Sequence, residues 1–297
     1  MSALSTSHRQ NAAFGAGAIL ASQASQNAGA AFGKHLFPVV GAEGMATLRI
    51  GLAAVMLLAI LRPWRFPVGR AHAVSLVLYG ATMGLMSLLI YLAIARIPIG
   101  IAVAIEVTGP LSIVLLGARR PLDFLWLAAA VGGLLLLLPL HATITLDALG
   151  VLYAAGAAVC WALYVVFGRR VSGPLGPRAV AWGMLVAALI VAPIGFGHAG
   201  TALFAPGILL AGGAVAALSS AVPYSLEMSA MGRLPASVVG ILLSTAPAVA
   251  ALMGFLILGE RLAMVQWLAI GCIVAASAGS ALTIKPPART PSEDAAR

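Results

Sequence analysis

The chain has 297 residues, of which 62% are hydrophobic and only 8% charged, and its formal net charge is +9. A soluble domain carries about 25% charged residues, so this composition excludes an ordinary soluble protein. Apolar stretches of about 20 residues recur along the sequence, the length that crosses a bilayer as an α-helix, and the alternating short strands of a membrane barrel are lacking. The basic residues stand singly or in small groups between apolar stretches, which is typical of cytoplasmic loops and argues against a nucleic-acid partner.

Proline, glycine and arginine residues divide the apolar sequence into ten predicted transmembrane helices, so we expect an all-α membrane protein. In chain order these helices are expected at residues 13–34, 43–61, 73–95, 98–117, 121–140, 148–168, 178–196, 206–231, 236–257 and 263–283. Residues 1–12 are polar, and the apolar stretch that follows is too long and too polar for a signal peptide, so a cytoplasmic segment and a retained helix are expected. The tail 285–297 is predicted to be disordered and cytoplasmic.

The basic residues give the orientation of these helices. With the N-terminus in the cytoplasm, 13 of the 17 basic residues fall in cytoplasmic segments: Arg9, Arg62, Arg65, Arg70, Arg119, Arg120, Arg169, Arg170, Arg178, Arg233, Lys285, Arg289 and Arg297. The external loops hold Lys34, Arg96 and Arg261, and Arg49 lies within a helix. Because cytoplasmic loops carry an excess of Lys and Arg, both termini are predicted to be cytoplasmic.

The predicted helix at 13–34 contains a cluster of polar residues in the segment ILASQASQNAGA. At 100° per residue, Ser22, Gln23, Gln26 and Asn27 lie within about 140° of arc, so they form one stripe. Two explanations are open. The stripe makes hydrogen bonds between helices, or it faces a water-filled cavity, and four polar groups on one face favour the cavity.

The next two candidates are basic residues. Arg49 lies inside the helix at 43–61 and either binds a carboxylate or extends its side chain to the membrane interface. Lys34, at the end of the preceding helix, is expected to be an interfacial anchor.

A carboxyl group lies in the middle of the helix at 98–117. Ionisable residues at membrane depth are costly and are functional candidates by default, and Glu106 is the foremost of them here. Glu106, Gly109 and Pro110 share one helix face, and Pro110 leaves a nearby carbonyl without its helical hydrogen bond. Glu106 is therefore a candidate for substrate binding and proton coupling, the alternative being a structural role as a protonated or paired acid.

Further candidates are weaker. Glu227, a second candidate for proton coupling, shares a stripe with Tyr224 in the helix at 206–231, although it would equally suit an ion pair near the inner membrane face. Ser244 lies one turn before Pro247 and supplies either a binding hydroxyl or a partner for the kinked backbone. Aromatic residues near helix ends are usually interfacial, and those that suit a pocket wall are Tyr91, Trp161 and Tyr164.

An internal repeat divides the chain. Arg96-Ile97-Pro98 recurs as Arg233-Leu234-Pro235, and the same shift of 137 residues relates Thr108 to Thr245 and Pro110 to Pro247. The halves, 13–142 and 143–284, hold five predicted helices each. Because five is odd, the second half would enter the membrane from the opposite side, which gives two inverted five-helix repeats. Binding sites of such transporters lie near the membrane midplane, where the repeats meet.

The sequence contains no pattern of an enzyme. It has no glycine-rich phosphate loop, no HExxH motif and no clustered His or Cys residues, so no catalytic residue, metal or cofactor is expected. Cys160 and Cys272 both fall in apolar helices and are expected to be free packing residues. The sequence fixes no oligomeric state, and a monomer is compatible with it.

Several motifs resemble the drug/metabolite transporter superfamily of the EamA type. An Arg-x-Pro motif precedes the helices at 98–117 and 236–257, and LGERL stands at 258–262. More specific motifs resemble the bacterial inner-membrane threonine/homoserine exporters of this superfamily; they are LFPVVGAEGMATLRI from Leu36, IPIGIAVAIEVTGPL from Ile97, RRPLDFLW from Arg119 and AVPYSLEMSAMGRLP from Ala221. The resemblance covers residues 15–284 and implies proton-driven efflux of small amino acids or similar polar metabolites.

The residues and the resemblance together predict a multi-pass exporter of small polar amino acids in the bacterial inner membrane, with protons as the coupling ion and lipid as its surroundings. A cavity with amides, an acid and a base would suit a zwitterion. Two rival functions remain open at this point, an uncoupled facilitator with the same cavity and a broad exporter of drugs or metabolites. A third, an intramembrane enzyme or scaffold, lacks a reactive cluster.

Overall fold

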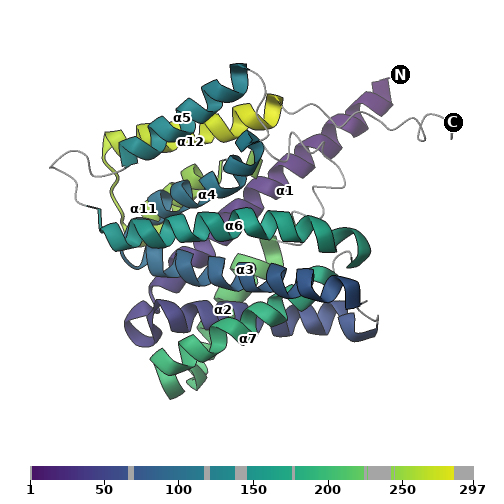
Figure 1. Cartoon of the computed structure of the whole chain (residues 1–297), viewed down its shortest axis with the longest axis vertical. Coiled ribbons are helices and arrows are strands. Elements are labelled where there is room, and N and C mark those ends of the chain that lie inside the picture. The colour runs from purple at the N-terminus through teal and green to yellow at the C-terminus, as the bar shows by residue number, and fades with distance from the viewer. Residues whose placement is uncertain are drawn as a thin grey trace.

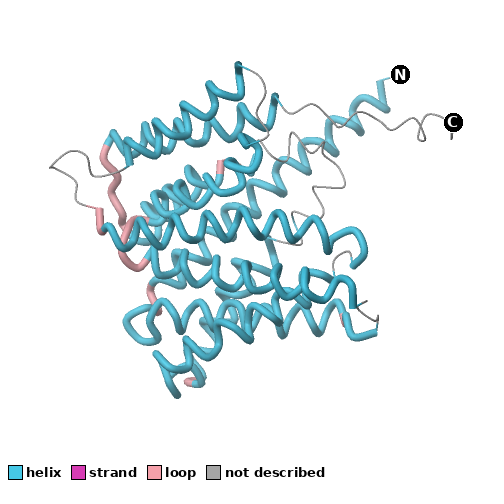
Figure 2. Tube along the Cα trace, in the orientation of Figure 1, coloured by secondary structure: helices cyan, strands magenta, loops and turns pink. Residues whose placement is uncertain are grey.

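The computed structural model describes residues 2–65, 70–116, 121–137, 146–175, 178–223, 226, 242–243 and 245–283. In this part the chain is helical apart from short turns and contains no β-strand (Figures 1 and 2). The prediction of an all-α protein is therefore confirmed. The predicted tail 285–297 lies outside the described residues.

The helices follow one another with short connections. Their bounds are α1 Ser2–Lys34, α2 Phe37–Leu61, η1 Pro63–Arg65, α3 Arg70–Ile94, α4 Ile99–Leu116, α5 Pro121–Leu137, α6 Ala148–Leu175, α7 Arg178–Ala199, η2 Gly200–Phe204, α8 Pro206–Ala216, η3 Ala217–Ala221, α11 Ala246–Leu258 and α12 Met264–Thr283. Helix α1 begins before the predicted residue 13, because no proline interrupts the polar segment and alanine and glutamine favour a helix. The predicted helix at 236–257 is described from 246 on, as α11.

Four helical segments are long and apolar enough to cross a membrane: Phe37–Leu61, His72–Ile94, Ala148–Gly168 and Arg178–Phe204. Shorter apolar helices occupy Ile99–Ser112, Phe124–Gly133, Pro206–Ser220, Ala246–Leu258 and Met264–Ala276. Helix α1 is long but carries the polar stripe, which lowers its hydropathy. The structure thus supports several membrane-spanning helices among the described residues.

The helices pack in pairs that bring distant parts of the sequence together. Helix α2 lies along α7, α3 along α6 and α7, and α5 along α12, whereas α4 contacts both α6 and α11 (Figure 1). Small residues allow the close approach. A Cβ atom on Gly109 of α4 would overlap the carbonyl oxygen of Ala158 in α6, and one on Gly80 of α3 would lie 2.6 Å from the carbonyl oxygen of Gly183 in α7. Such small residues are typical of helix contacts in membranes.

Two irregular turns lie next to the region described below. Pro110 stands inside α4, and because proline has no N–H, the carbonyl of Glu106 lacks its helical hydrogen bond there. The turn η3, Ala217–Ala221, is a π-helix, a rare conformation that often occurs at functional sites. It packs against α1, where Ser25 donates a hydrogen bond to the carbonyl of Leu218 at 2.7 Å.

Candidate functional site

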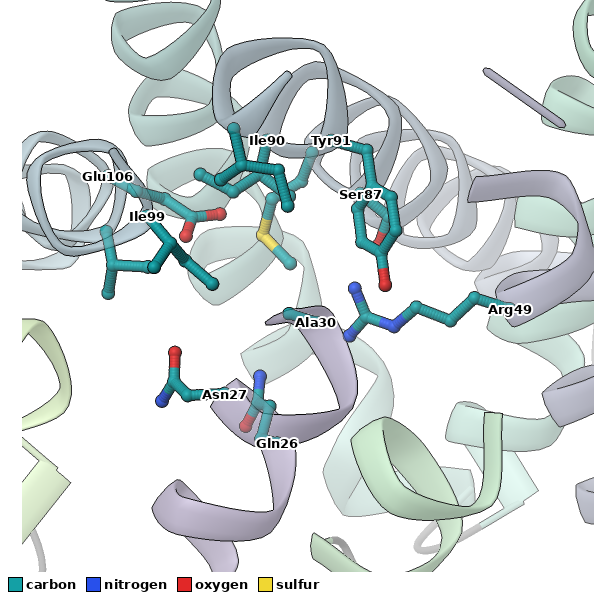
Figure 3. Close-up of a pocket in the computed structure, with 12 residues that line it drawn as sticks. Gln26, Asn27, Ala30, Arg49, Ser87, Ile90, Tyr91, Ile99 and Glu106 are labelled. Atoms are coloured by element: carbon teal, nitrogen blue, oxygen red, sulfur yellow. The ribbon is translucent and has the colours of Figure 1, made fainter. Parts of the chain in front are cut away.

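A small cavity lies between α1, α2, α3 and α4 (Figure 3). Its volume is about 60 Å³, room for several water molecules, since one water needs about 10–15 Å³ on this measure. The lining combines polar and apolar side chains from the four helices: Gln26, Asn27, Ala30, Arg49, Met86, Ser87, Ile90, Tyr91, Ile94, Ile99, Val103 and Glu106.

Helical spacing explains why these residues share one cavity. The α3 residues lie at positions 86, 87, 90, 91 and 94, and the α4 residues at 99, 103 and 106, so each set occupies one helix face. In α1 the spacing of Gln26, Asn27 and Ala30 does the same. Alanine at position 30 leaves room between the amide groups of α1 and the side chains of α3.

Arg49 reaches the cavity from α2. Its guanidinium carbon lies 5.4 Å from the centre of the Tyr91 ring, which is a cation–π distance. Its Nη2 donates a long hydrogen bond of 3.4 Å to the carbonyl of Ser219 in η3. Figure 3 shows the side chain extending into the cavity. Of the two expectations for Arg49, this geometry suits the binding of a carboxylate, because the guanidinium faces the cavity, but carboxylate binding itself stays a prediction.

Tyr91 forms part of the cavity wall and is 1% exposed. Its hydroxyl oxygen is buried and makes no hydrogen bond of full geometry among the described residues, but the Arg49 guanidinium and the Ser219 side chain lie close enough to interact with it. The ring is fixed from the other side by Phe37, at a centroid distance of 5.8 Å.

Glu106 lies across the cavity from Arg49 (Figure 3). It is buried, and in the described part of the chain no basic nitrogen lies within 4.0 Å of its carboxyl oxygens. The cavity therefore has an acid on one wall and a base on another, with the amides of Gln26 and Asn27 from α1 between them.

The polar stripe of α1 divides into two groups. Gln26 and Asn27 line the cavity, and Asn27 donates a hydrogen bond of 2.9 Å to the carbonyl of Gln23. Ser22 and Gln23 are buried but do not line it, and Ser22 donates a hydrogen bond of 3.2 Å to the carbonyl of Pro223. Gln26 and Asn27 thus face a cavity, which suits one explanation, and Ser22 makes the inter-helix hydrogen bond of the other, while substrate binding by the stripe stays a prediction.

Two further predicted site residues are described but do not line this cavity. Trp161 and Tyr164 lie on α6, half-buried, and Tyr164 stacks on Tyr79 at a centroid distance of 4.9 Å with a hydroxyl–hydroxyl distance of 3.2 Å. Tyr224, Glu227 and Ser244 lie outside the described residues.

The sequence analysis missed two residues, Ser87 and Glu260. Ser87 is buried and lines the cavity one helical turn before Tyr91, a spacing that could have identified it. Glu260, noted only as part of a motif, accepts a 2.7 Å hydrogen bond from Lys34 Nζ and a 2.9 Å bond from the Ile99 N–H. No local pattern links these three positions, which are far apart in the sequence.

Comparison with known proteins decides the family. Residues 148–282 match the EamA-like transporter family. The chain is 47% identical over 268 residues to the threonine/homoserine exporter RhtA of Escherichia coli K12, covering 90% of this chain and 91% of that relative. The chain belongs to the EamA-like transporter family. The same identity and coverage relate this family member to RhtA of Salmonella typhimurium LT2.

Two more distant similarities agree with this assignment to the EamA-like family. The inner membrane transporter YedA of Escherichia coli K12, described as uncharacterized, is 28% identical over 243 residues, which is 77% of this chain and 78% of that one. A crystal structure described only as that of a protein aligns with 95% of this chain and 99% of its own, with a TM-score of 0.55 and 21% identity. At that identity the likeness supports the fold alone.

Proposed function

We propose that this transporter exports small zwitterionic amino acids, of the threonine and homoserine kind, across the bacterial inner membrane in exchange for protons. The observation that supports it most directly is the cavity in which Arg49 and Glu106 face each other. A free amino acid carries one carboxylate and one ammonium, so these two walls match its charges. The names of the RhtA relatives point to the same substrate class.

We propose that transport uses two inverted five-helix repeats, residues 13–142 and 143–284, with both termini in the cytoplasm. The pattern of helix packing supports this arrangement. If each helix is exchanged with its counterpart in the other half, the contact of α4 with α6 becomes that of α11 with α1, and the contact of α3 with α7 becomes that of α8 with α2. Both members of each pair occur, as a pseudo-twofold axis requires.

The size of the cavity fits an alternating-access cycle. Pockets for drug-sized ligands have volumes of about 300–1,000 Å³, so a cavity of about 60 Å³ must enlarge before it takes a whole amino acid. We infer that rocking of the two repeats opens it to one side of the membrane at a time.

Glu106 is the proposed site of proton exchange. Its carboxyl group faces the same small space as the substrate would. A proton on Glu106 and an ammonium beside it would compete for one negative charge, which couples the two. Glu227, the second predicted coupling residue, keeps that role only as a sequence-based prediction.

The experiment is counterflow in vesicles that contain the purified protein. A panel of labelled amino acids is offered with and without an imposed pH gradient. Uptake of threonine and homoserine that the gradient accelerates supports the proposal. Uptake that ignores the gradient selects an uncoupled facilitator, and efflux of dyes without uptake of any amino acid selects a broad drug exporter.

A further inference from the structure

The Arg49 guanidinium is held in place, but most of its N–H donors make no recorded hydrogen bond within the described residues. The Tyr91 ring and the Ser219 carbonyl fix its position, at 5.4 Å and 3.4 Å respectively. Arginine has five N–H donors, and in the described part of the chain they meet the Ser219 carbonyl, at a long 3.4 Å, and the Tyr91 hydroxyl. Several donors therefore remain for a ligand in the cavity.

The Tyr91 hydroxyl is a second donor beside this guanidinium. It is buried and makes no hydrogen bond of full geometry among the described residues, although buried hydroxyl groups are nearly always hydrogen-bonded. The Arg49 guanidinium and the Ser219 side chain are its polar neighbours. A Cβ atom at Gly33 would lie 3.4 Å from this oxygen, so glycine there leaves the hydroxyl free of a covering side chain. In Figure 3 the hydroxyl points toward the Arg49 guanidinium.

Resting on the proposed function, we propose that the substrate binds in one orientation, with its carboxylate between the Arg49 guanidinium and the Tyr91 hydroxyl and its ammonium toward Glu106. A carboxylate accepts hydrogen bonds and pairs with a guanidinium in a bidentate manner, whereas an ammonium only donates. The donors lie on the α2–α3 side of the cavity and the acid lies on α4. The apolar wall formed by Ile90, Ile94, Ile99 and Val103 receives a short side chain.

The variant Tyr91→Phe tests this orientation, because it removes the hydroxyl and keeps the ring, whose centre lies 5.4 Å from the Arg49 guanidinium carbon. A hydrogen bond to a charged group is worth about tenfold to a hundredfold in affinity. We expect the KM for threonine to rise at least about tenfold, and the inhibition constant of the matching amino alcohol, which lacks the carboxylate, to stay unchanged. Tyr79→Phe is the control, since it makes the same change on α3 and Tyr79 does not line the cavity.

Each outcome decides the proposal. If Tyr91→Phe raises the KM for threonine and the inhibition constant of the amino alcohol by the same factor, the hydroxyl has a structural role and the proposed orientation is wrong. If Tyr91→Phe exports threonine with an unchanged KM, the hydroxyl does not bind the carboxylate, while amino-acid export itself still stands. If the wild-type protein transports no amino acid, the proposed function is wrong, and the orientation, which rests on it, is wrong as well.

A separate observation concerns the three ion pairs recorded among the described residues. Lys34 pairs with Glu260 at 2.7 Å and Arg96 with Asp147 at 2.7 Å. His198 lies 3.8 Å from Glu43, and this contact is an ion pair only when the imidazole is protonated. Each pair joins a residue before 142 to one after 143, so each connects the two proposed repeats. Most of the described loops also gather at one end of the bundle, on the left in Figure 2.

The backbone around these pairs supports the contacts. The Glu260 carboxylate that binds Lys34 also accepts the Ile99 N–H at the start of α4, at 2.9 Å. Gly41, beside Glu43, has a φ of +71°, and a Cβ there would lie 2.7 Å from the His198 ring. Glycine at position 41 thus permits the approach of α7 to α2.

With the N-terminus in the cytoplasm, all six residues lie on the external side. The geometry points to an external latch, formed by these three pairs, that closes the cavity toward the outside and is broken once in each transport cycle. Because the latch joins the two repeats on the external side, its closure would favour the conformation that admits substrate from the cytoplasm.

Charge exchange at the exposed Arg96–Asp147 pair tests the latch without a substrate. In a protein whose Cys160 and Cys272 are replaced by serine, Gln26→Cys reports whether the cavity is open to a membrane-impermeant thiol reagent added to whole cells. We expect Arg96→Asp and Asp147→Arg each to raise the labelling rate several-fold, and the double variant to restore the original rate. Labelling that stays unchanged in both single variants, at normal expression, would overturn the latch and leave the export proposal untouched.

Discussion

Arg49 and Glu106 reach one cavity from helices α2 and α4, although their sequence neighbours are almost all apolar. A charged residue in the middle of a membrane helix costs about 2.5–3.5 kcal/mol on insertion scales. The position 137 residues after Glu106 is Leu243, so the corresponding place in the other half holds an apolar side chain. The carboxyl group is thus not required by the fold, which favours a role in transport.

Replacement of Glu106 by glutamine should abolish proton coupling, and it also removes the charge proposed to hold the substrate ammonium. The side chain keeps its size but no longer binds and releases a proton. We expect uptake driven by a pH gradient to fall at least about tenfold, while the protein still inserts and purifies as the wild type does. Vesicle transport with labelled threonine, with and without the gradient, gives the measurement, and normal gradient-driven uptake by Glu106→Gln would exclude Glu106 as the coupling group.

At the level of elements, glycines set the distance between helices. Gly109 of α4 packs so closely on the Ala158 carbonyl of α6 that a Cβ atom would overlap it, whereas Gly132 of α5 has open space beside its Cα. Because Gly109 lies three residues after Glu106, a shift of α4 would also move the cavity wall.

Alanine at these two positions should therefore have opposite effects. Gly109→Ala forces α4 from α6 and is expected to destabilise the protein by about 1–3 kcal/mol, as overpacking does. Gly132→Ala is the matched control, which adds the same methyl group in open space and gains up to about 1 kcal/mol of helix propensity. Melting in detergent measures both, and equal melting temperatures would mean that α4 and α6 are less tightly packed than the structure shows.

The helices were predictable from sequence because a helix that crosses a bilayer needs an apolar stretch of a defined length. Most of the observed helices begin and end within a few residues of the expected positions. Gln26, Asn27, Arg49 and Glu106 were identifiable because polar groups are rare in such stretches. The tertiary contacts could not be predicted from the sequence. The π-helical turn at Ala217–Ala221 and the pairing of Lys34 with Glu260 depend on helices far apart in the sequence, and no local pattern encodes them.

At the scale of the whole molecule, the external latch must be weak enough to open in each transport cycle. The side chains of Arg96 and Asp147 are 44% and 37% exposed, and exposed ion pairs contribute little to stability because water and salt screen them. Weak ion pairs suit a latch that opens in every transport cycle. Strong ion pairs would leave the externally open state too sparsely populated to release substrate.

The pH dependence of the latch follows from its carboxyl group. Both Arg96 and Asp147 lie in loops, and the hydrogen bond from Arg96 holds the pKa of the Asp147 carboxyl below its ordinary value of 3.8. A carboxyl group whose pKa is lowered by a partner keeps that interaction above its ordinary pKa and loses it as the pH falls through the lowered value. The Arg96–Asp147 pair should therefore stay intact from pH 8 down to about pH 5 and break only in stronger acid.

Removal of this charge should consequently have the same effect at every physiological pH. We expect Asp147→Asn to raise external labelling of Gln26→Cys by the same factor from pH 6 to pH 8. The ratio of the two rates at each pH cancels the pH dependence of the thiol reagent itself. A ratio that changes across this range would show that a group other than Asp147 controls the closure, and His198, which is a cation only when protonated and lies 3.8 Å from Glu43, would then be the next to replace.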